Sequence, residues 1–248
     1  MQLKNKVVSS ENIRGAMIFE FFSPGIPIIL KNADCEFIIF DMEHGGLSLE
    51  QFKMLATISN SNDISPLIRI PEVSYNYVAR ALDLGAAGIM APMINTAEDA
   101  IKIVKSSKYP PEGVRGAGFG FAHDSYNNQN PLSYIKKAND ELINIIQIET
   151  KLGLENVEAI SAIDGVDCLW VGHFDLTNFL GIPGDFSSSI YLDAIKRIVE
   201  AGKKNNKSLG IMINNKDELE MYTALGFNMI ALGTEMNILT RSISEIIS

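Results

Sequence analysis

Basic residues and cysteine are scarce in this chain, and each shortage argues against a class of function. The 248 residues include 21 Lys plus Arg against 30 Asp plus Glu, which gives a formal net charge of −9. A surface of this charge repels phosphate backbones and anionic lipid, so we expect neither nucleic acid nor a membrane as partner. Cys35 and Cys168 form neither a disulfide framework nor a Cys-x-x-Cys metal knuckle. We interpret both as reduced core residues of a cytoplasmic protein.

Long apolar segments are also missing. No apolar run approaches the roughly 20 residues that a membrane-spanning helix needs. Residues 1–10 are polar and include Lys4 and Lys6, so we expect no secretory signal. Because no linker or low-complexity tract divides the chain, we expect a single domain over residues 1–248, a length typical of one α/β barrel.

Short β-rich runs alternate with stretches of helical period along the chain, which is typical of a parallel sheet. The predicted strands are Ala16–Phe19, Phe37–Asp41, Ile64–Ile70, Gly88–Ala91, Ile143–Ile148, Cys168–Val171, Ser208–Ile213 and Met229–Gly233. The predicted helices begin near Ile26, Ser48, Ser74, Thr96, Glu155, Ile190, Lys216 and Met236. Ser48, Thr96 and Asn215 suit N-caps, and Gly85, Gly226 and Asp63 suit the turns that end helices. The pattern predicts an α/β fold, a closed (β/α)8 TIM barrel.

One long segment, Ser107–Asn139, lacks a clear helical or strand pattern. It includes Pro110 and Pro111, the glycine-rich stretch Gly116–Gly120 and the polar tract Ser125–Asn130. The glycine-rich stretch has no Gly-Lys-Ser/Thr and follows no predicted strand, so it does not indicate a nucleotide site. Irregular segments of this length are usually functional, and we predict such a loop here.

Two carboxylates follow consecutive predicted strands, at the barrel end that carries the active site in this fold. Glu149 comes directly after one strand and Asp175 shortly after the next. Neighbouring strands lie roughly 4.8 Å apart, so both side chains can reach one ion. Oxygen ligands of this kind suit Mg²⁺ or Mn²⁺ better than zinc. The alternative is that each carboxylate caps a helix or pairs with a lysine; for the pair together, we favour the metal.

Other polar residues end the second and third predicted strands. Asp41 is close enough in sequence to orient the imidazole of His44, which suits a general base near neutral pH. Arg69 would point into the mouth of the barrel and stabilise a developing negative charge. The alternative for His44 is a purely structural role. The alternative for Arg69 is an ion pair with Asp41 or Glu43.

Lysine is absent from all the predicted strands. Schiff-base enzymes of this fold carry a lysine on a strand inside the barrel, so imine chemistry is disfavoured. The turns after the last two strands, Asn214-Asn215 and Gly233-Thr234, lack a glycine-rich phosphate cradle. This absence favours an unphosphorylated substrate.

Several motifs in order are similar to those of the HpcH/HpaI aldolase family, metal-dependent pyruvate aldolases that act on 2-oxo acids. They are Phe40-Asp-Met-Glu-His44, the strand end at Arg69, Ala91-Pro-Met93, Tyr109-Pro-Pro-Glu-Gly-Val-Arg-Gly116, Gln147-Ile-Glu-Thr150 and Val171-Gly-His-Phe-Asp-Leu176. The resemblance covers nearly the whole chain. It implies a barrel of the phosphoenolpyruvate/pyruvate type in which Glu149 and Asp175 ligate Mg²⁺ or Mn²⁺, with Co²⁺ as a further option.

The resemblance also implies roles for individual residues. Arg69 would contact the keto oxygen, His44 supported by Asp41 would handle a proton through water, and Gln147 would line the pyruvate pocket. Asp83 matches an aspartate that reaches a neighbouring subunit's site. Homo-oligomers are implied as well, as hexamers or trimers of dimers that exchange their C-terminal helices.

The chain departs from the family pattern near the predicted metal site. Gly172-His173-Phe174 stands where the family usually has Gly-Pro-x, and His123 in the long loop replaces a common arginine. We expect Gly172, His173 and Phe174 to contact the substrate. We also expect this substrate to differ from the substrates of other family members.

These features predict a carbon–carbon lyase that reversibly cleaves a 4-hydroxy-2-oxo acid to pyruvate and an aldehyde. One alternative is a lyase of the citrate- or malyl-coenzyme A type, which would need a basic nucleotide pocket. A barrel that binds a ligand without catalysis is the other.

Overall fold

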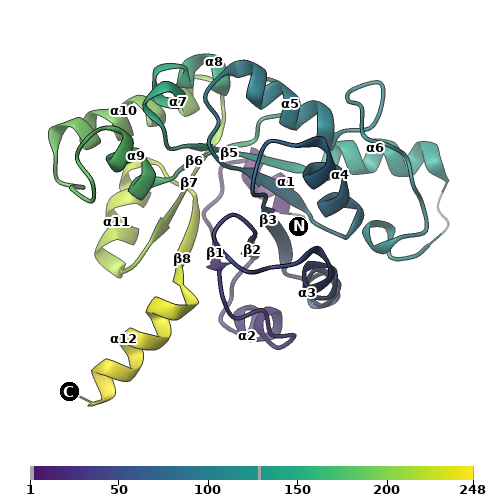
Figure 1. The fold of residues 1–248 in the computed structure, drawn as a ribbon, viewed down its shortest axis with the longest axis horizontal. Helices are drawn as coiled ribbons and strands as arrows, with labels where there is room; N and C mark the ends of the chain where they lie inside the picture. Colours follow the sequence, from purple (N-terminus) through teal and green to yellow (C-terminus); the bar gives the residue numbers. More distant parts are fainter. Residues whose placement is uncertain (1–2, 128–129, 248) are drawn as a thin grey trace.

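The computed structural model describes residues 3–127 and 130–247. Its parallel strands close into a barrel in sequence order, with helices around them (Figure 1). The strands are β1 (Ile13–Ile18), β2 (Phe37–Asp41), β3 (Ser65–Arg69), β4 (Gly88–Ala91), β5 (Ile143–Ile148), β6 (Cys168–Val171), β7 (Ser208–Ile213) and β8 (Met229–Thr234). The helices in the described residues are α1 (Leu3–Val8), α2 (Ile26–Asn32), α3 (Leu49–Ser61), α4 (Tyr75–Asp83), α5 (Ala97–Ser107), the short 3-10 helix η1 (Ala122–Asp124), α6 (Pro131–Glu141), α7 (Lys151–Glu155), α8 (Val157–Ser161), α9 (His173–Phe179), α10 (Ser189–Lys204), α11 (Lys216–Leu225) and α12 (Glu235–Ile247). The predicted (β/α)8 barrel is confirmed.

The predicted bounds of β2, β4, β5, β6 and β7 agree with the structure. These strands are buried, so they are apolar runs bounded by turn residues. The prediction for β1 was shifted, because this strand begins at Ile13 and ends at Ile18. Phe19 leaves the sheet because its backbone N–H donates to the carboxylate of Glu235.

Local capping signals account for most helix bounds. Ser48 and Thr96 form capping boxes, and the Asn215 side chain accepts from the backbone N–H of Glu218 at 2.8 Å. Gly85 and Gly226, which end helices, have φ near +105°. The helix predicted to begin near Glu155 corresponds to α8, which begins at Val157. Helix α7, which begins at Lys151 after its N-cap Thr150, was not predicted.

The prediction that Ser107–Asn139 is irregular was wrong for its last third. Helix α6 begins at Pro131, and the side chain of Asn130 accepts from the amides of Leu132 and Ser133. Asn-Pro is a helix-start signal that the sequence did contain. Asn128 and Gln129 of the polar tract lie outside the described residues. Helices α1 and α9 were also not predicted.

The barrel interior is filled by alternate residues of each strand, as period-two strand geometry requires. Phe37, Ile39, Leu67, Ile145 and Trp170 belong to this inner apolar cluster. Leu3 and Val7 of α1 join the same cluster, so α1 closes the end of the barrel where the strands begin.

Both cysteines are buried and free, as the core interpretation required. Helix α12, in yellow, extends away from the rest of the molecule (Figure 1). None of its described residues is buried. Within the described ranges, no helix combines the length and apolar character needed to cross a membrane.

Candidate active site

Strand alternation carries the predicted polar residues into the mouth of the barrel. Asp41 continues the inward row of Phe37 and Ile39, and Arg69 follows Leu67 in the same way. Asp41 and Arg69 are register partners across β2 and β3. The geometry therefore brings these side chains together from separate parts of the sequence.

Glu149 lies just past β5 and is only 1% exposed. Its Oε1 accepts a hydrogen bond from the backbone N–H of Met93 at 2.6 Å, and its Oε2 accepts from Gln147 Nε2 at 2.9 Å. Met93 has φ +54°, the left-handed region that side chains rarely adopt, and in this conformation its amide reaches Glu149. Burial raises the pKa of Glu149 to about 7, against the opposing effect of the Met93 amide.

Gly172 lies beside Glu149 and leaves space for its carboxylate. A Cβ at Gly172 would lie 2.2 Å from Glu149 Oε2, so no larger residue fits without displacing the acid. Asp175 follows in the first turn of α9 and is partly exposed. The charges of Asp175 and Glu43 both raise the pKa of Glu149, which shows that the three acids are close enough to repel one another.

Arg69 is a cation at the acidic group, which consists of Asp41, Glu43, Glu149 and Asp175. Its Nε donates to Asp41 Oδ1 at 2.5 Å, and its Nη1 lies 3.0 Å from Glu43 Oε2. The ion pairs that the sequence left as an alternative are therefore present. They do not use the whole guanidinium, because the buried Nη2 has no hydrogen-bond partner within the described chain.

His44 is presented by the turn after β2 with its side chain 59% exposed. Asp41 Oδ2 accepts from the backbone N–H groups of His44 at 2.8 Å and Gly45 at 3.0 Å. The imidazole Nε2 lies 3.7 Å from Glu43 Oε2. Asp41 thus supports His44 through the backbone of the turn, whereas the sequence predicted that it orients the ring.

An aromatic cluster lies beside Asp175 on α9 and the following loop. The rings of His173, Phe174 and Phe186 are mutually in contact, with centroids 4.6 to 5.3 Å apart. Phe174 remains 55% exposed, whereas His173 is buried. Burial lowers the pKa of His173 to about 4, so its imidazole is neutral near pH 7.

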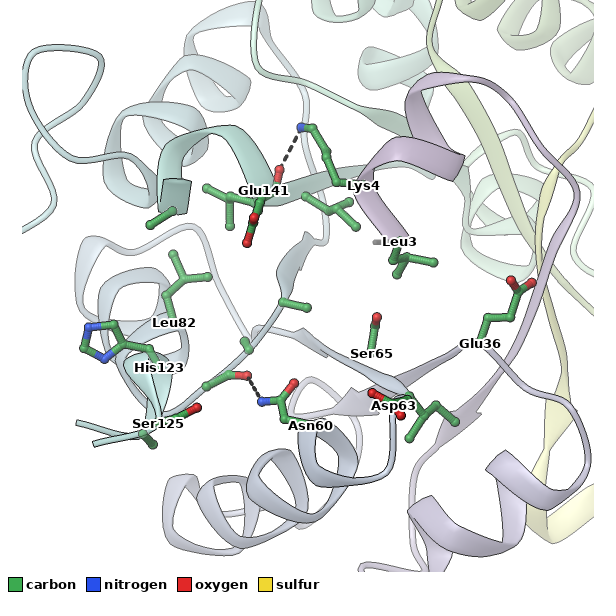
Figure 2. Close-up of a pocket in the computed structure, with 18 of the residues that line it drawn as sticks. Leu3, Lys4, Glu36, Asn60, Asp63, Ser65, Leu82, His123, Ser125 and Glu141 are labelled. Carbon is green, nitrogen blue, oxygen red and sulfur yellow. Dashed lines mark hydrogen bonds between the residues drawn. The ribbon is translucent and has the colours of Figure 1, made fainter. Parts of the chain in front are cut away.

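The structure does not bring His123 or Asp83 to this site within one chain. His123 Nδ1 lies 3.3 Å from the carbonyl oxygen of Asp83, and the Asp83 carboxylate pairs with Arg115 at 2.6 Å. Figure 2 shows His123 at the edge of a separate hollow of about 760 Å³. Ser65 also lines this hollow and begins β3, so the hollow lies toward the end of the barrel opposite the acidic group.

Three contributors to the site were not predicted. Glu43 was predicted as part of the polar turn after β2 and as a possible partner for Arg69, but not as an acid of the site. The amide of Met93 had no recognised role, although the Ala91-Pro-Met93 motif marked its position. Phe186 follows no motif, so only its packing against Phe174 reveals it.

The buried charge of Glu149 predicts a pH dependence of stability in the metal-free protein. Folding raises its pKa from 4.5 to about 7, so the stabilisation it confers is complete below pH 4.5 and is lost as pH rises through 7. Relative to Glu149→Gln, the wild type should lose about 3 kcal/mol of unfolding free energy between pH 4.5 and 8. Urea unfolding of both proteins in chelator tests this. Parallel pH profiles would contradict it.

The comparisons with known proteins point in the same direction as this geometry. A family model described as HpcH/HpaI aldolase/citrate lyase matches residues 23–242. The chain belongs to this family. It is 34% identical over 223 residues to a hydroxypyruvate/pyruvate aldolase of Deinococcus radiodurans, covering 86% of this chain and 77% of the relative. It is 30% identical over 223 residues to a 4-hydroxy-2-oxovalerate aldolase of Rhodococcus jostii, covering 88% and 84%.

The fold of the family agrees with the barrel. The crystal structure of an HpcH/HpaI aldolase from Desulfitobacterium hafniense superposes with a TM-score of 0.95 at 27% identity, covering 100% of this chain and 95% of that one. The predicted family and the phosphoenolpyruvate/pyruvate type of barrel are thereby confirmed.

Proposed function

We propose that this HpcH/HpaI family member is a divalent-metal-dependent aldolase that reversibly cleaves a 4-hydroxy-2-oxo acid to pyruvate and an aldehyde. The observation that carries the proposal is the convergence of Glu149 and Asp175 with Arg69 and the Asp41–His44 turn at one barrel mouth. Two relatives bear aldolase names that fit this chemistry.

Glu149 and Asp175 are the residues that would hold the metal. Burial, and after it the charges of Glu43 and Asp175, raise the pKa of Glu149, and a bound cation would favour its ionised form. Within the described residues no cluster of three His, Cys, Asp or Glu side chains suits a metal, so water and substrate would supply the other ligands. Oxygen donors of this kind favour Mg²⁺, Mn²⁺ or Co²⁺. When bound, the cation would polarise the substrate's keto oxygen and anchor its carboxylate.

Arg69 stabilises the charge that develops during cleavage. Its Nε and Nη1 are held by Asp41 and Glu43, which fixes the plane of the guanidinium. The unpaired Nη2 is left to donate to the substrate's keto oxygen as that oxygen gains enolate charge. A preorganised buried donor of this kind contributes mainly in the transition state.

His44 removes the proton of the C4 hydroxyl, directly or through one water. Its exposed ring can reach substrate, and the turn that carries it is fixed by Asp41. The C4 hydroxyl loses its proton, the C3–C4 bond breaks, and the aldehyde leaves. The pyruvate enolate then takes up a proton at C3 to give pyruvate.

The remaining substrate contacts come from Gln147 and the Gly172-His173-Phe174 segment. Gln147 Oε1 is buried without a partner within the described chain, so the amide can serve the pyruvate portion. The exposed ring of Phe174 and the neutral imidazole of His173 form an aromatic wall beside Asp175. The aldehyde portion of the substrate would pass this wall.

One assay tests the proposed reaction. The protein is incubated with Mn²⁺ or Mg²⁺ and a panel of 4-hydroxy-2-oxo acids, and pyruvate is followed with and without chelator. Chelator-sensitive pyruvate release supports the aldolase. Its absence across the panel, for protein that binds Mn²⁺, would contradict the proposal.

The protein is also proposed to assemble through α12. Met236, Leu239 and Ile243 are exposed on this helix at helical spacing, and an open groove of about 670 Å³ lies between α12 and the barrel. Ile213 and Leu232 line that groove, which α12 of another copy could cover. Family resemblance implies exchange of this helix in a hexamer.

Assembly through α12 has a direct test. Placing aspartate at Leu239 and Ile243 should reduce the mass in light scattering from an oligomer to a monomer, because burial of two charges opposes association. Glu245→Gln on the same helix should leave the mass unchanged. An unchanged mass for the double variant would reject α12 as the interface.

A further inference from the structure

Glu235, the first residue of α12, binds a loop at the opposite end of the sequence. Its Oε1 accepts hydrogen bonds from three consecutive backbone N–H groups, those of Phe19 at 3.0 Å, Glu20 at 2.6 Å and Phe21 at 3.0 Å. Its Oε2 lies 3.2 Å from the Phe19 nitrogen. Successive amides that converge in this way form an anion-binding nest, and here the anion is a side chain of the protein itself.

This contact is separate from the capping of α12. The side chain of Thr234 accepts from the backbone N–H of Asn237 at 3.2 Å and so caps the helix. Both oxygens of Glu235 face the Phe19–Phe21 loop instead. A role beyond the helix itself is therefore indicated.

The loop that Glu235 holds contacts two parts of the candidate active site. The ring of Phe19 lies 5.4 Å from the guanidinium carbon of Arg69, a cation–π contact. The backbone of Phe19 meets the turn that carries His44, because a Cβ at Gly45 would lie 2.5 Å from the Phe19 carbonyl oxygen. The same Cβ would lie 2.8 Å from the carbonyl oxygen of Asp41. The loop thus packs against Arg69 and against the turn that carries the proposed base, His44.

We propose that Glu235 is a positioning residue for the reaction. Its carboxylate fixes the Phe19–Phe21 loop, which in turn holds Arg69 from one side and the His44 turn from the other. Removal of the carboxylate leaves three adjacent backbone donors without their acceptor, so the loop is released. This inference rests on the proposed function, because it assumes that Arg69 and His44 act on substrate.

The test compares Glu235→Ala and Glu235→Gln with the matched control Glu245→Ala. Glu245 is an exposed acid on the same helix, and its carboxylate lies 4.0 Å from Arg241 Nε, one turn earlier. Hydrogen exchange of residues 19–21 reports the loop, steady-state kinetics report kcat and KM, and calorimetric titration with Mn²⁺ reports the metal site. Thermal unfolding and light scattering check the fold and the assembly.

For Glu235→Ala we expect amide exchange at residues 19–21 to be faster by about tenfold or more, and kcat to fall by about tenfold to a hundredfold. KM and Mn²⁺ affinity should change by less than about threefold, because Glu149 and Asp175 are untouched. Glu235→Gln should be intermediate, since its amide oxygen can still accept. Glu245→Ala should match the wild type in every measurement.

Unchanged exchange at residues 19–21 in a folded Glu235→Ala protein would overturn the proposal, as would an unchanged kcat. Equal losses in kcat, Mn²⁺ affinity and thermal stability would indicate a general structural role and would also overturn it. If the wild type binds Mn²⁺ but releases no pyruvate, the proposed function fails. Amide hydrogen exchange at residues 19–21 and 41–45 still tests the structural part of the proposal in that case. Unchanged exchange in Glu235→Ala would show that Glu235 does not hold the loop.

Discussion

Glu149→Gln is expected to abolish metal-dependent pyruvate formation, with kcat/KM falling by about a thousandfold or more. The substitution removes a negative ligand while keeping the shape of the side chain. The backbone N–H of Met93 can still donate to the remaining carbonyl oxygen. In the wild type Gln147 Oε1 has no hydrogen-bond partner within the described chain. In the variant, Gln147 can turn its amide so that this oxygen accepts from the amide nitrogen of the introduced glutamine. The expected loss therefore comes from the metal site and not from the fold.

Steady-state kinetics with Mn²⁺ and calorimetric titration of Mn²⁺ measure this effect. Glu98→Gln, an exposed acid in the first turn of α5, is the matched control and should behave as the wild type. Circular dichroism checks that the barrel is retained. Activity and Mn²⁺ affinity close to the wild-type values would show that Glu149 is not a ligand.

Arg69→Lys is expected to lower kcat by about a hundredfold or more while Mn²⁺ binding is retained. The guanidinium contacts Asp41 and Glu43 and still has Nη2 unpartnered within the described residues. An ammonium is a point charge without the planar fork, so it cannot keep both ion pairs and also donate to the substrate. The loss should appear mainly in kcat, because the interaction strengthens as enolate charge develops.

Separate measurement of kcat and KM, together with Mn²⁺ titration, distinguishes this loss from that of Glu149→Gln. Arg80→Lys, an exposed arginine on α4, serves as control. A kcat within about tenfold of the wild type would remove Arg69 from the proposed mechanism.

Much of the barrel could be predicted because its signals are local. Buried parallel strands are short apolar runs between turn residues, so the bounds of β5 and β6 agree with the structure. Caps such as Ser48 act over three residues, a distance that sequence spacing reveals directly. Helix α6 was missed although Asn130-Pro131 marks its start, and α9 was missed because its segment is polar and aromatic without a clear apolar period.

Part of the candidate site could be predicted for the same reason. Asp41, Arg69 and Glu149 lie at or just past strand ends, and a closed parallel barrel must bring such positions to one rim. The sequence could not show how the imidazole of His44 is held, since the turn between Asp41 and His44 directs that carboxylate to backbone amides. It also could not show that Asp83 and His123 contact each other, with Asp83 paired to Arg115, away from the acidic group.

By itself the sequence determined the strand order, most element bounds and the positions of the acids, because these depend on alternation and on caps within a few residues. Only the tertiary structure decided the electrostatics of Glu149, since its burial, the Met93 amide and the space at Gly172 come from three separate strand ends. It alone revealed the contact of Glu235 with Phe19, which joins the two ends of the chain. Contacts of this range exist only once the barrel has closed, because closure places β8 beside β1.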